Sequence, residues 1–204
     1  MLLPTLIVLF VKVLEQIPVD PLPRSALSVN KLMEEMYTFH NEIALRENAS
    51  AASVASLAAV GKDYFTSIAG GLLTLGEIHA PLSQTHKFIT RCSELNYENE
   101  IKTHLINHYK IPGWGSSFVK GNPDSVFFAV DCMLEGSKTH ESQKRVTEFL
   151  HEEGLMLYPN ASYYTVACCI ESGIPIERAA FHLVNARLPA WTELWLLTKQ
   201  KKLR

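Results

Sequence analysis

A glycine-containing apolar helix is followed at once by a histidine and a proline in Gly70-Gly71-Leu72-Leu73-Thr74-Leu75-Gly76-Glu77-Ile78-His79-Ala80-Pro81. Pro81 can open the next helix, because proline is favoured in a first helical turn. An imidazole at that helix N-terminus lies in positive backbone potential, which favours its neutral form. Neutral imidazole can donate a hydrogen bond to a developing oxyanion, so His79 is a candidate catalytic residue.

Helical periodicity extends outward from this stretch over most of the chain. Apolar residues recur every three or four positions in 27–43, 64–75, 101–109, 126–134, 146–151 and 191–197. Prolines and glycines separate these segments, and alternating strand patterns are nearly absent. The sequence therefore predicts an all-α fold of roughly ten helices in a single domain over 1–204, with a smaller lobe over about 82–157 inserted in the helical core.

Composition predicts an ordinary globular protein. Hydrophobic residues make up 47% and charged residues 20% of 204 residues, and the net charge is -2. With this small net charge, the chain has no overall positive electrostatic potential that would attract nucleic acid or an anionic membrane. The four cysteines form no CxxC pair, which favours a reduced, cytoplasmic setting. The apolar segment 1–14 contains Lys12 and is too short to cross a bilayer, so we expect a buried helix there.

Segment 48–60 consists almost entirely of small residues and has no charge from Ala49 to Val60. Solvated helices usually carry charge on one face. This helix is therefore expected to cross others closely, at the centre of the fold or at a subunit interface.

Several motifs, in this order, resemble those of the citrate synthase family. They are Asn48-Ala49-Ser50 with Asp63 downstream, Ala69-Gly70-Gly71 through Gly76-Glu77-Ile78-His79, Ile111-Pro112-Gly113-Trp114-Gly115, Tyr158-Pro159-Asn160-Ala161-Ser162-Tyr163-Tyr164, and Ala186-Arg187-Leu188-Pro189-Ala190-Trp191. The resemblance implies a citrate synthase-like helical fold truncated at its N-terminal side, since the motifs correspond to the later half or so of a full-length member.

The family's reaction implies roles for the matching positions. Such enzymes enolise acetyl-CoA and add it to oxaloacetate. His79 matches the histidine that stabilises the enol oxygen, and Arg187 matches an arginine that binds a substrate carboxylate. The loop that recognises the adenine of CoA is matched by Ile111, Gly113, Trp114 and Gly115, and the aromatic ring between the two glycines suggests stacking on adenine.

Other positions depart from the family pattern. The second histidine and its following arginine fall on Ser116 and Ser117, and the catalytic aspartate falls on Ser162. An early histidine falls on Leu45, and another arginine on Ser125. A serine hydroxyl is no general base near neutral pH unless another group deprotonates it. Losing one positioned acid or base typically costs about a hundred- to ten-thousand-fold in rate, so ordinary citrate synthesis is not expected.

Three functions remain open. The first is a non-catalytic or repurposed descendant that binds an acyl-CoA-like ligand or a partner protein as a homodimer. The second is an active acyltransferase or citryl-CoA lyase-type enzyme, in which Ser116, Ser117 and Ser162 join His79. The third is a structural dimerisation module without a ligand. The resemblance implies CoA or acetyl-CoA and a dicarboxylate as ligands, with Ser116, Ser162 and Arg187 in substrate binding, and no metal.

Each candidate residue also has a purely architectural interpretation. His79 can be a buried histidine whose nitrogens are satisfied at a helix junction. Arg187 can cap a helix that ends before Leu188-Pro189, and 112–115 can be a plain turn between helices. His104 and His108, four residues apart, more simply mark a solvated helix face than a metal site.

Overall fold

The computed structural model describes residues 26–201 except 47, 77–78, 94–96, 108–109 and 117–118. The helix expected over 1–14 lies outside this range, as do Ser117 and His108. In the described part, nine α-helices and one 3₁₀ helix account for the regular structure, and no strand is present. They are α2 (Ala26–Ala44), α3 (Ala49–Ala59), α4 (Tyr64–Leu73), α5 (Leu82–Ser93), α6 (Tyr97–Ile106), η1 (Ser125–Phe127), α7 (Phe128–Leu134), α8 (Lys138–Glu152), α9 (Ala161–Glu171) and α10 (Ile176–Lys201). The all-α prediction is confirmed.

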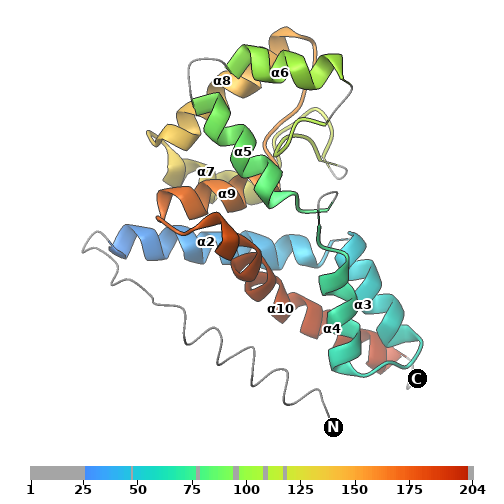
Figure 1. Cartoon of the computed structure of the whole chain (residues 1–204). Helices are drawn as coiled ribbons and strands as arrows, with labels where there is room; N and C mark the ends of the chain where they lie inside the picture. The colour runs from blue at the N-terminus through green and yellow to red at the C-terminus, as the bar shows by residue number, and fades with distance from the viewer. Residues whose placement is uncertain are drawn as a thin grey trace.

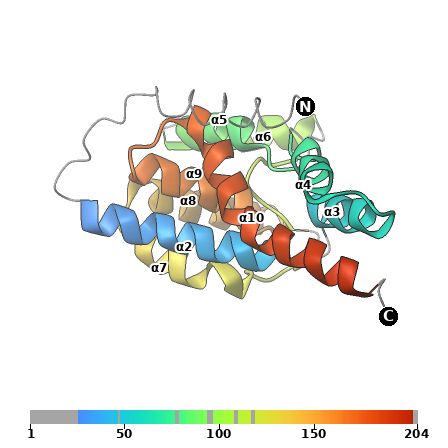
Figure 2. The ribbon, with the colours of Figure 1, turned by 90° about the horizontal axis from the view of Figure 1, so that it is seen from below.

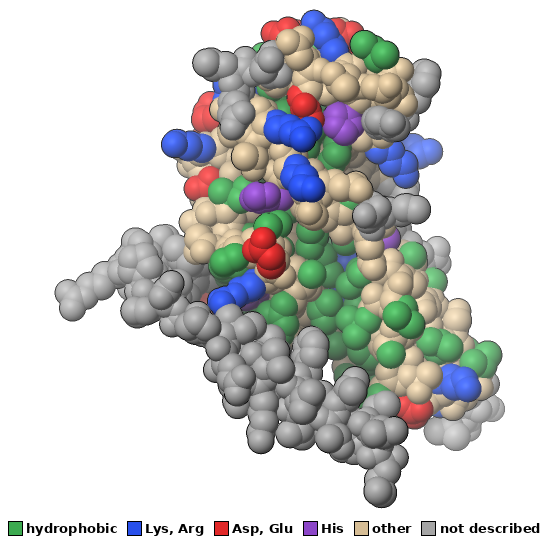
Figure 3. Space-filling model, viewed as in Figure 1, with side chains coloured by type: hydrophobic (Ala, Val, Ile, Leu, Met, Phe, Trp, Pro, Cys, Tyr) green, Lys and Arg blue, Asp and Glu red, His purple; other side chains and the backbone are tan. Residues whose placement is uncertain are grey.

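Two long helices, α2 and α10, cross each other and organise the fold (Figure 1). Helices α5 to α9 lie above the crossing in Figure 1. Helices α3 and α4 lie beside the C-terminal half of α10, as Figure 2 also shows. On the face shown in Figure 3, basic and histidine side chains gather over α5 and α6, whereas apolar side chains gather over α10 and α4.

The apolar residues form two cores. The larger core joins α2 to α5, α6, α7, α8, α9 and the first half of α10. Its residues with no more than 1% exposure include Met36, Cys92, Ile101, Val130, Leu134, Val146, Leu150, Tyr163, Val166, Ala167, Cys168, Cys169, Ala179 and Leu183. The smaller core lies among α2, α3, α4 and α10 and contains Ala44, Val54, Ile68, Ala190 and Trp191. Because α2 and α10 contribute to both cores, they fix one group of helices against the other.

Helix α3 packs closely on α4, as its small residues predict. A Cβ atom on Gly70 would lie 2.2 Å from Leu57 Cδ1, and one on Gly71 would lie 2.8 Å from Val54 Cγ2. The first turns of both helices are capped by side chains, Asn48 for α3 and Asp63 for α4. Glycines therefore allow a backbone approach that no larger side chain would permit.

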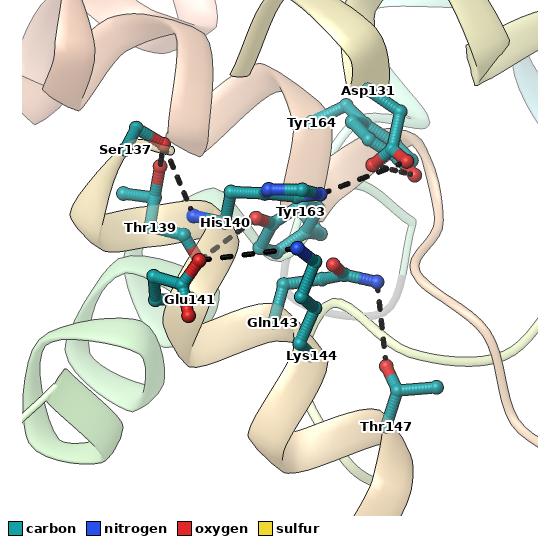
Figure 4. Close-up of polar contacts among 10 residues, drawn as sticks. All are labelled: Asp131, Ser137, Thr139, His140, Glu141, Gln143, Lys144, Thr147, Tyr163 and Tyr164. Carbon is teal, nitrogen blue, oxygen red and sulfur yellow. Dashed lines mark hydrogen bonds and ion pairs between the residues drawn. The ribbon is translucent and has the colours of Figure 1, made fainter. Parts of the chain in front are cut away.

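A cluster of polar contacts fastens α9 to α7 and α8 (Figure 4). Tyr164 donates its hydroxyl hydrogen to Asp131 at 2.9 Å, and His140 Nε2 lies 3.9 Å from the same carboxylate. Tyr163 donates to the carbonyl of Thr139 at 3.1 Å. These bonds fix the register of α9, whose first turn enters the functional site described below.

Helix α10 continues through Pro189, so Arg187 lies inside a helix of 26 residues. The interpretation of Arg187 as a cap at a helix end is therefore wrong. Proline lacks the N–H that would bond to the carbonyl four residues earlier, that of Asn185, yet the helix runs on to Lys201. No helix in the described part of the chain is both long and apolar enough to span a membrane.

Candidate ligand-binding site

The loop 111–115 is fixed by backbone hydrogen bonds to the segment that precedes α9. Gly115 N donates to the Tyr158 carbonyl at 2.8 Å, and Asn160 N donates to the Gly113 carbonyl at 2.9 Å. The side-chain amide of Asn160 also donates to the Gly115 carbonyl at 2.9 Å. Gly113 and Gly115 have φ values of +88° and +86°, which glycine adopts without strain. The two glycines thus give this loop its conformation.

Trp114 is 6% exposed and belongs to the core beside the site. Its indole N–H donates to Thr147 Oγ1 at 3.0 Å. Its ring centroid lies 5.6 Å from that of Phe88 and 5.2 Å from that of Tyr163. The expectation that this ring stacks on adenine is at odds with its burial, because other aromatic rings already pack against it.

Asn160 connects this loop to the first turn of α9. Its side-chain oxygen accepts hydrogen bonds from the backbone N–H groups of Ser162 at 2.9 Å and Tyr163 at 3.4 Å. Asn160 is therefore the N-cap of α9. Ser162, in the position where the family has its catalytic aspartate, is 7% exposed, and its hydroxyl forms no hydrogen bond with any described residue.

His79 lies in the connection between α4 and α5, and α5 begins directly after Pro81, as the sequence predicts. Ala80 has a φ of +70°, in the left-handed region that favours glycine. His79 Nε2 lies 3.5 Å from Ser50 Oγ of α3. Burial, and second the positive charge of Arg187, lower the pKa of His79 below its usual value. The imidazole is therefore neutral at neutral pH, the form expected for a hydrogen-bond donor to an oxyanion.

Arg187 is a buried cation with neutral hydrogen-bond partners. It is 4% exposed, and its Nη1 donates to Ser50 Oγ at 3.3 Å while its Nε donates to His40 Nδ1 at 3.4 Å. It forms no ion pair with a described residue. Burial lowers the pKa of Arg187 to about 10, so the guanidinium remains charged at neutral pH. A buried charge without a counter-charge is costly, so an anion beside Arg187 would be favourable.

His40, on α2, connects Arg187 to the first turn of α9. Thr165 Oγ1 donates to the Ala161 carbonyl at 2.6 Å, so it accepts from His40 Nε2 at 2.7 Å. The proton of His40 is therefore on Nε2, which leaves Nδ1 to accept from Arg187. Burial, and second the charge of Arg187, hold the pKa of His40 well below its usual value. The neutral ring orients the guanidinium without neutralising it.

One cavity of about 870 Å³ is lined by every predicted site residue that the structure describes. It is lined by His79, Ile111, Gly113, Trp114, Gly115, Ser116, Ser162 and Arg187, together with charged side chains from α5 and neighbouring segments. Its two described carboxylates, Asp124 and Glu100, are paired with Arg46 and Arg91. Lys87, Lys110 and Arg187 also line the cavity and form no ion pair with a described residue. The cavity is therefore suited to an anionic ligand.

Sequence reasoning missed His40, although its position was informative. Met36, Phe39 and Ile43 follow the apolar spacing of α2, and His40 lies on the same buried side, four residues after Met36. A polar side chain on a buried, apolar helix face needs a buried hydrogen-bond partner. Nothing in the sequence identified that partner as Arg187, 147 positions away.

Ser116 accepts a hydrogen bond from Val119 N at 3.4 Å and lies at the edge of the cavity. No group of three His, Cys, Asp or Glu side chains is placed to hold a metal ion within the part of the chain that the structure describes. The site is therefore built from one buried arginine, one neutral histidine, serine hydroxyls and a glycine-containing loop.

No protein-family model and no curated protein sequence matches this chain. Solved structures do match. The citryl-CoA lyase from Hydrogenobacter thermophilus superposes with a TM-score of 0.72 at 20% sequence identity, over 84% of this chain and 70% of the lyase chain. The citrate synthase from Thermotoga maritima superposes with a TM-score of 0.70 at 22% identity, over 82% of this chain.

A third similar structure is the ATP citrate lyase of Methanosaeta concilii in complex with (3S)-citryl-CoA, with a TM-score of 0.69 at 18% identity over 90% of this chain. The matched part is 48% of the Thermotoga citrate synthase chain and 32% of the ATP citrate lyase chain. This chain thus corresponds to about half of that synthase and a third of that lyase. Its described helices have the citrate synthase-like fold that the sequence motifs imply.

Proposed function

We propose that this chain binds an acyl-CoA-type thioester in the cavity between loop 111–115, His79 and Arg187, and does not synthesise citrate. One observation carries the proposal. The positions that match the family's CoA loop, enol-stabilising histidine and carboxylate-binding arginine line a single cavity. In the same cavity, serines 116 and 162 occupy the positions of the family's second histidine and catalytic aspartate.

The bound form of a structural neighbour supports the ligand class. The ATP citrate lyase that shares this fold was solved in complex with (3S)-citryl-CoA. In the present chain, Lys87 and Lys110 line the cavity together with Arg187. None of these three side chains forms an ion pair with a described residue. Cationic side chains of this kind suit the phosphates and carboxylates of such a thioester.

Thermal unfolding in the presence of CoA or acetyl-CoA tests this proposal. At a ligand concentration a hundredfold above Kd, binding to the folded state adds about 2.7 kcal/mol of stability. For a chain of this size that shift corresponds to a rise in Tm of about 5–10 °C. We expect the rise with both compounds and not with ADP at the same concentration. Unchanged Tm values with CoA and acetyl-CoA would refute ligand binding and leave a structural module.

A thiol-release assay separates binding from turnover. With acetyl-CoA and oxaloacetate, we expect no release of free CoA above the rate without protein, because Ser162 cannot abstract the α proton as a carboxylate does. Rapid thiol release, or cleavage of citryl-CoA, would instead support the acyltransferase or lyase function in which serines join His79. The two assays together distinguish a binding protein, an enzyme and a ligand-free module.

We also propose that the chain forms a homodimer through α3 and α4. Helix α3 carries no charged residue. Large apolar side chains next to it are exposed, including Val60, Phe65 and Leu73. Exposed large apolar side chains beside an uncharged helix are characteristic of association sites. A second copy is the simplest occupant, because an uncharged face can pair with itself about a two-fold axis without like-charge repulsion.

Light scattering after gel filtration is expected to give twice the chain mass of 22.9 kDa. Leu73 is 86% exposed on α4 and is therefore the residue to replace with a charged one. Leu73→Glu should weaken the dimer at least about tenfold, because it would bury an unpaired carboxylate in the interface. Ile106→Glu is the matched control, because Ile106 is 76% exposed on α6, away from this face. A wild-type monomer, or equal effects of both substitutions, would contradict the proposed interface.

A further inference from the structure

Helix α10 carries an apolar stripe on the side that it turns away from the interior. Phe181, Val184 and Leu188 follow one another at spacings of three and four residues, so they lie on one face of the helix. Phe181 is 37% exposed, and Val184 and Leu188 are partly buried against the larger and the smaller core. Leu183 and Arg187, each one residue before a stripe residue, are buried. The stripe is therefore apolar surface that the described helices cover only in part.

No exposed charge interrupts this stripe within α10, all of which the structure describes. Between Arg178 and Glu193, α10 contains only two titratable residues. His182 is hydrogen-bonded to Tyr37 Oη at 2.8 Å, and Arg187 is 4% exposed. A solvated helix face usually carries charged side chains. The composition of this face therefore indicates that another apolar element covers it.

The chain has an apolar segment of its own outside the described residues. In 1–14, Pro4, Thr5 and Lys12 are the only residues that are not hydrophobic. A segment that would be apolar on every side as a helix has to be buried, whereas an amphipathic helix can leave one face in water. Lys12 is its single charged side chain, and a lysine stem can lie along apolar surface while the ammonium group reaches water. Segment 1–14 thus needs an apolar partner, as the α10 stripe does.

The length of the connecting chain allows the two to meet. Residues 15–25 join the segment to α2 and contain three prolines, which disfavour a helix. When extended, these 11 residues span up to about 36–40 Å. From Ala26 to Tyr37, α2 rises by only about 17 Å. Tyr37 is hydrogen-bonded to His182, the neighbour of Phe181 in the sequence. The stripe is therefore within reach of segment 1–14 of the same chain.

We propose that segment 1–14 docks on the stripe formed by Phe181, Val184 and Leu188 of its own chain. The contact removes water from apolar side chains on both elements. A tethered segment has an effective concentration in the millimolar range, about a thousandfold above that of a micromolar partner. The segment of the same chain is therefore favoured over a partner from solution. The contact does not depend on which ligand the cavity binds.

Hydrogen exchange of the full chain, read by mass spectrometry, tests the docking. Amides of residues 5–14 are expected to exchange at least about tenfold more slowly than those of an unstructured peptide of the same sequence. Phe181→Glu places a charge in the stripe and should remove this protection. Phe181→Ala, which removes apolar area without adding a charge, should speed the exchange at least about threefold. Ile106→Glu is the matched control, because Ile106 is 76% exposed on α6, and should leave the exchange unchanged.

Dilution and added vesicles identify the occupant. Protection by the segment of the same chain should persist through about a hundredfold dilution. Its loss on dilution would assign the stripe to a second copy, and protection only with phosphatidylcholine vesicles would assign the segment to a membrane. Either result would overturn the docking, as would exchange of 5–14 at the unstructured rate or equal protection in Phe181→Glu and Ile106→Glu. If circular dichroism shows that Phe181→Glu is unfolded, Phe181→Ala decides, and unchanged exchange in that variant refutes the docking.

Discussion

Lowering the pH below 6.5 should reduce the free energy of unfolding through His40, by no more than about 1.4 kcal/mol per pH unit. Burial, and second the charge of Arg187, hold the pKa of His40 well below 6.5 in the folded chain. In the unfolded chain the ring binds a proton as the pH falls below 6.5. The unfolded state then binds more protons than the folded state, so stability is present above pH 6.5 and is lost as the pH falls. His79, whose pKa is also lowered, contributes with the same sign.

Urea unfolding at a series of pH values measures this effect. His40→Gln is the informative variant, because the glutamine amide can accept from Arg187 and donate to Thr165 but does not titrate. The stability of the variant should fall less steeply below pH 6.5, by up to about 1.4 kcal/mol per pH unit. Parallel pH profiles for the wild type and His40→Gln would show that His40 is not kept neutral by the fold.

Gly113→Ala should cost about 2–5 kcal/mol of stability, from two sources. The φ of +88° at this position disfavours any residue with a Cβ by about 1–2 kcal/mol. The new methyl would also lie 2.8 Å from Thr85 Cγ2 and 3.2 Å from Tyr163 Cβ, and such overpacking typically costs about 1–3 kcal/mol. The neighbours are buried, so the loop has to move, and ligand affinity should fall with it.

Gly121→Ala separates these two costs. Gly121 also has a positive φ, +71°, but a Cβ there would meet no atom within 4 Å. Its substitution should therefore carry only the backbone cost, about 1–2 kcal/mol. Thermal or urea unfolding of both variants gives the comparison. Equal losses for the two substitutions would show that the contact of loop 111–115 with α5 and α9 adds nothing to stability.

The sequence was sufficient to predict the helical segments and many of the residues that line the cavity. Apolar spacing of three and four residues predicted the helical segments, because this spacing reflects which face of a helix is buried. The absence of charge in 49–60 predicted a closely packed helix, and α3 packs on α4 at Gly70 and Gly71. Motif order also selected the residues from α9, α10 and the loops that line one cavity.

Other features depend on partners that no local pattern specifies. Trp114 was expected to stack on a ligand, but its two neighbouring rings come from residues 88 and 163, which the fold brings together. Pro189 indicated a helix end near Arg187, yet tertiary packing of Ala190 and Trp191 keeps α10 continuous. The neutral partner of Arg187, His40, lies 147 positions away. Long-range contacts of this kind decide what a polar residue does.

The buried guanidinium of Arg187 has a consequence for the lifetime of the protein. Without an anion, the folded state bears the desolvation cost of this charge and the unfolded state does not. If the proposed ligand places an anion beside Arg187, it offsets that cost only in the folded state and lowers the population open to proteases. The resistance of this chain to degradation should therefore rise and fall with the concentration of its ligand, so that its abundance becomes a measure of ligand supply.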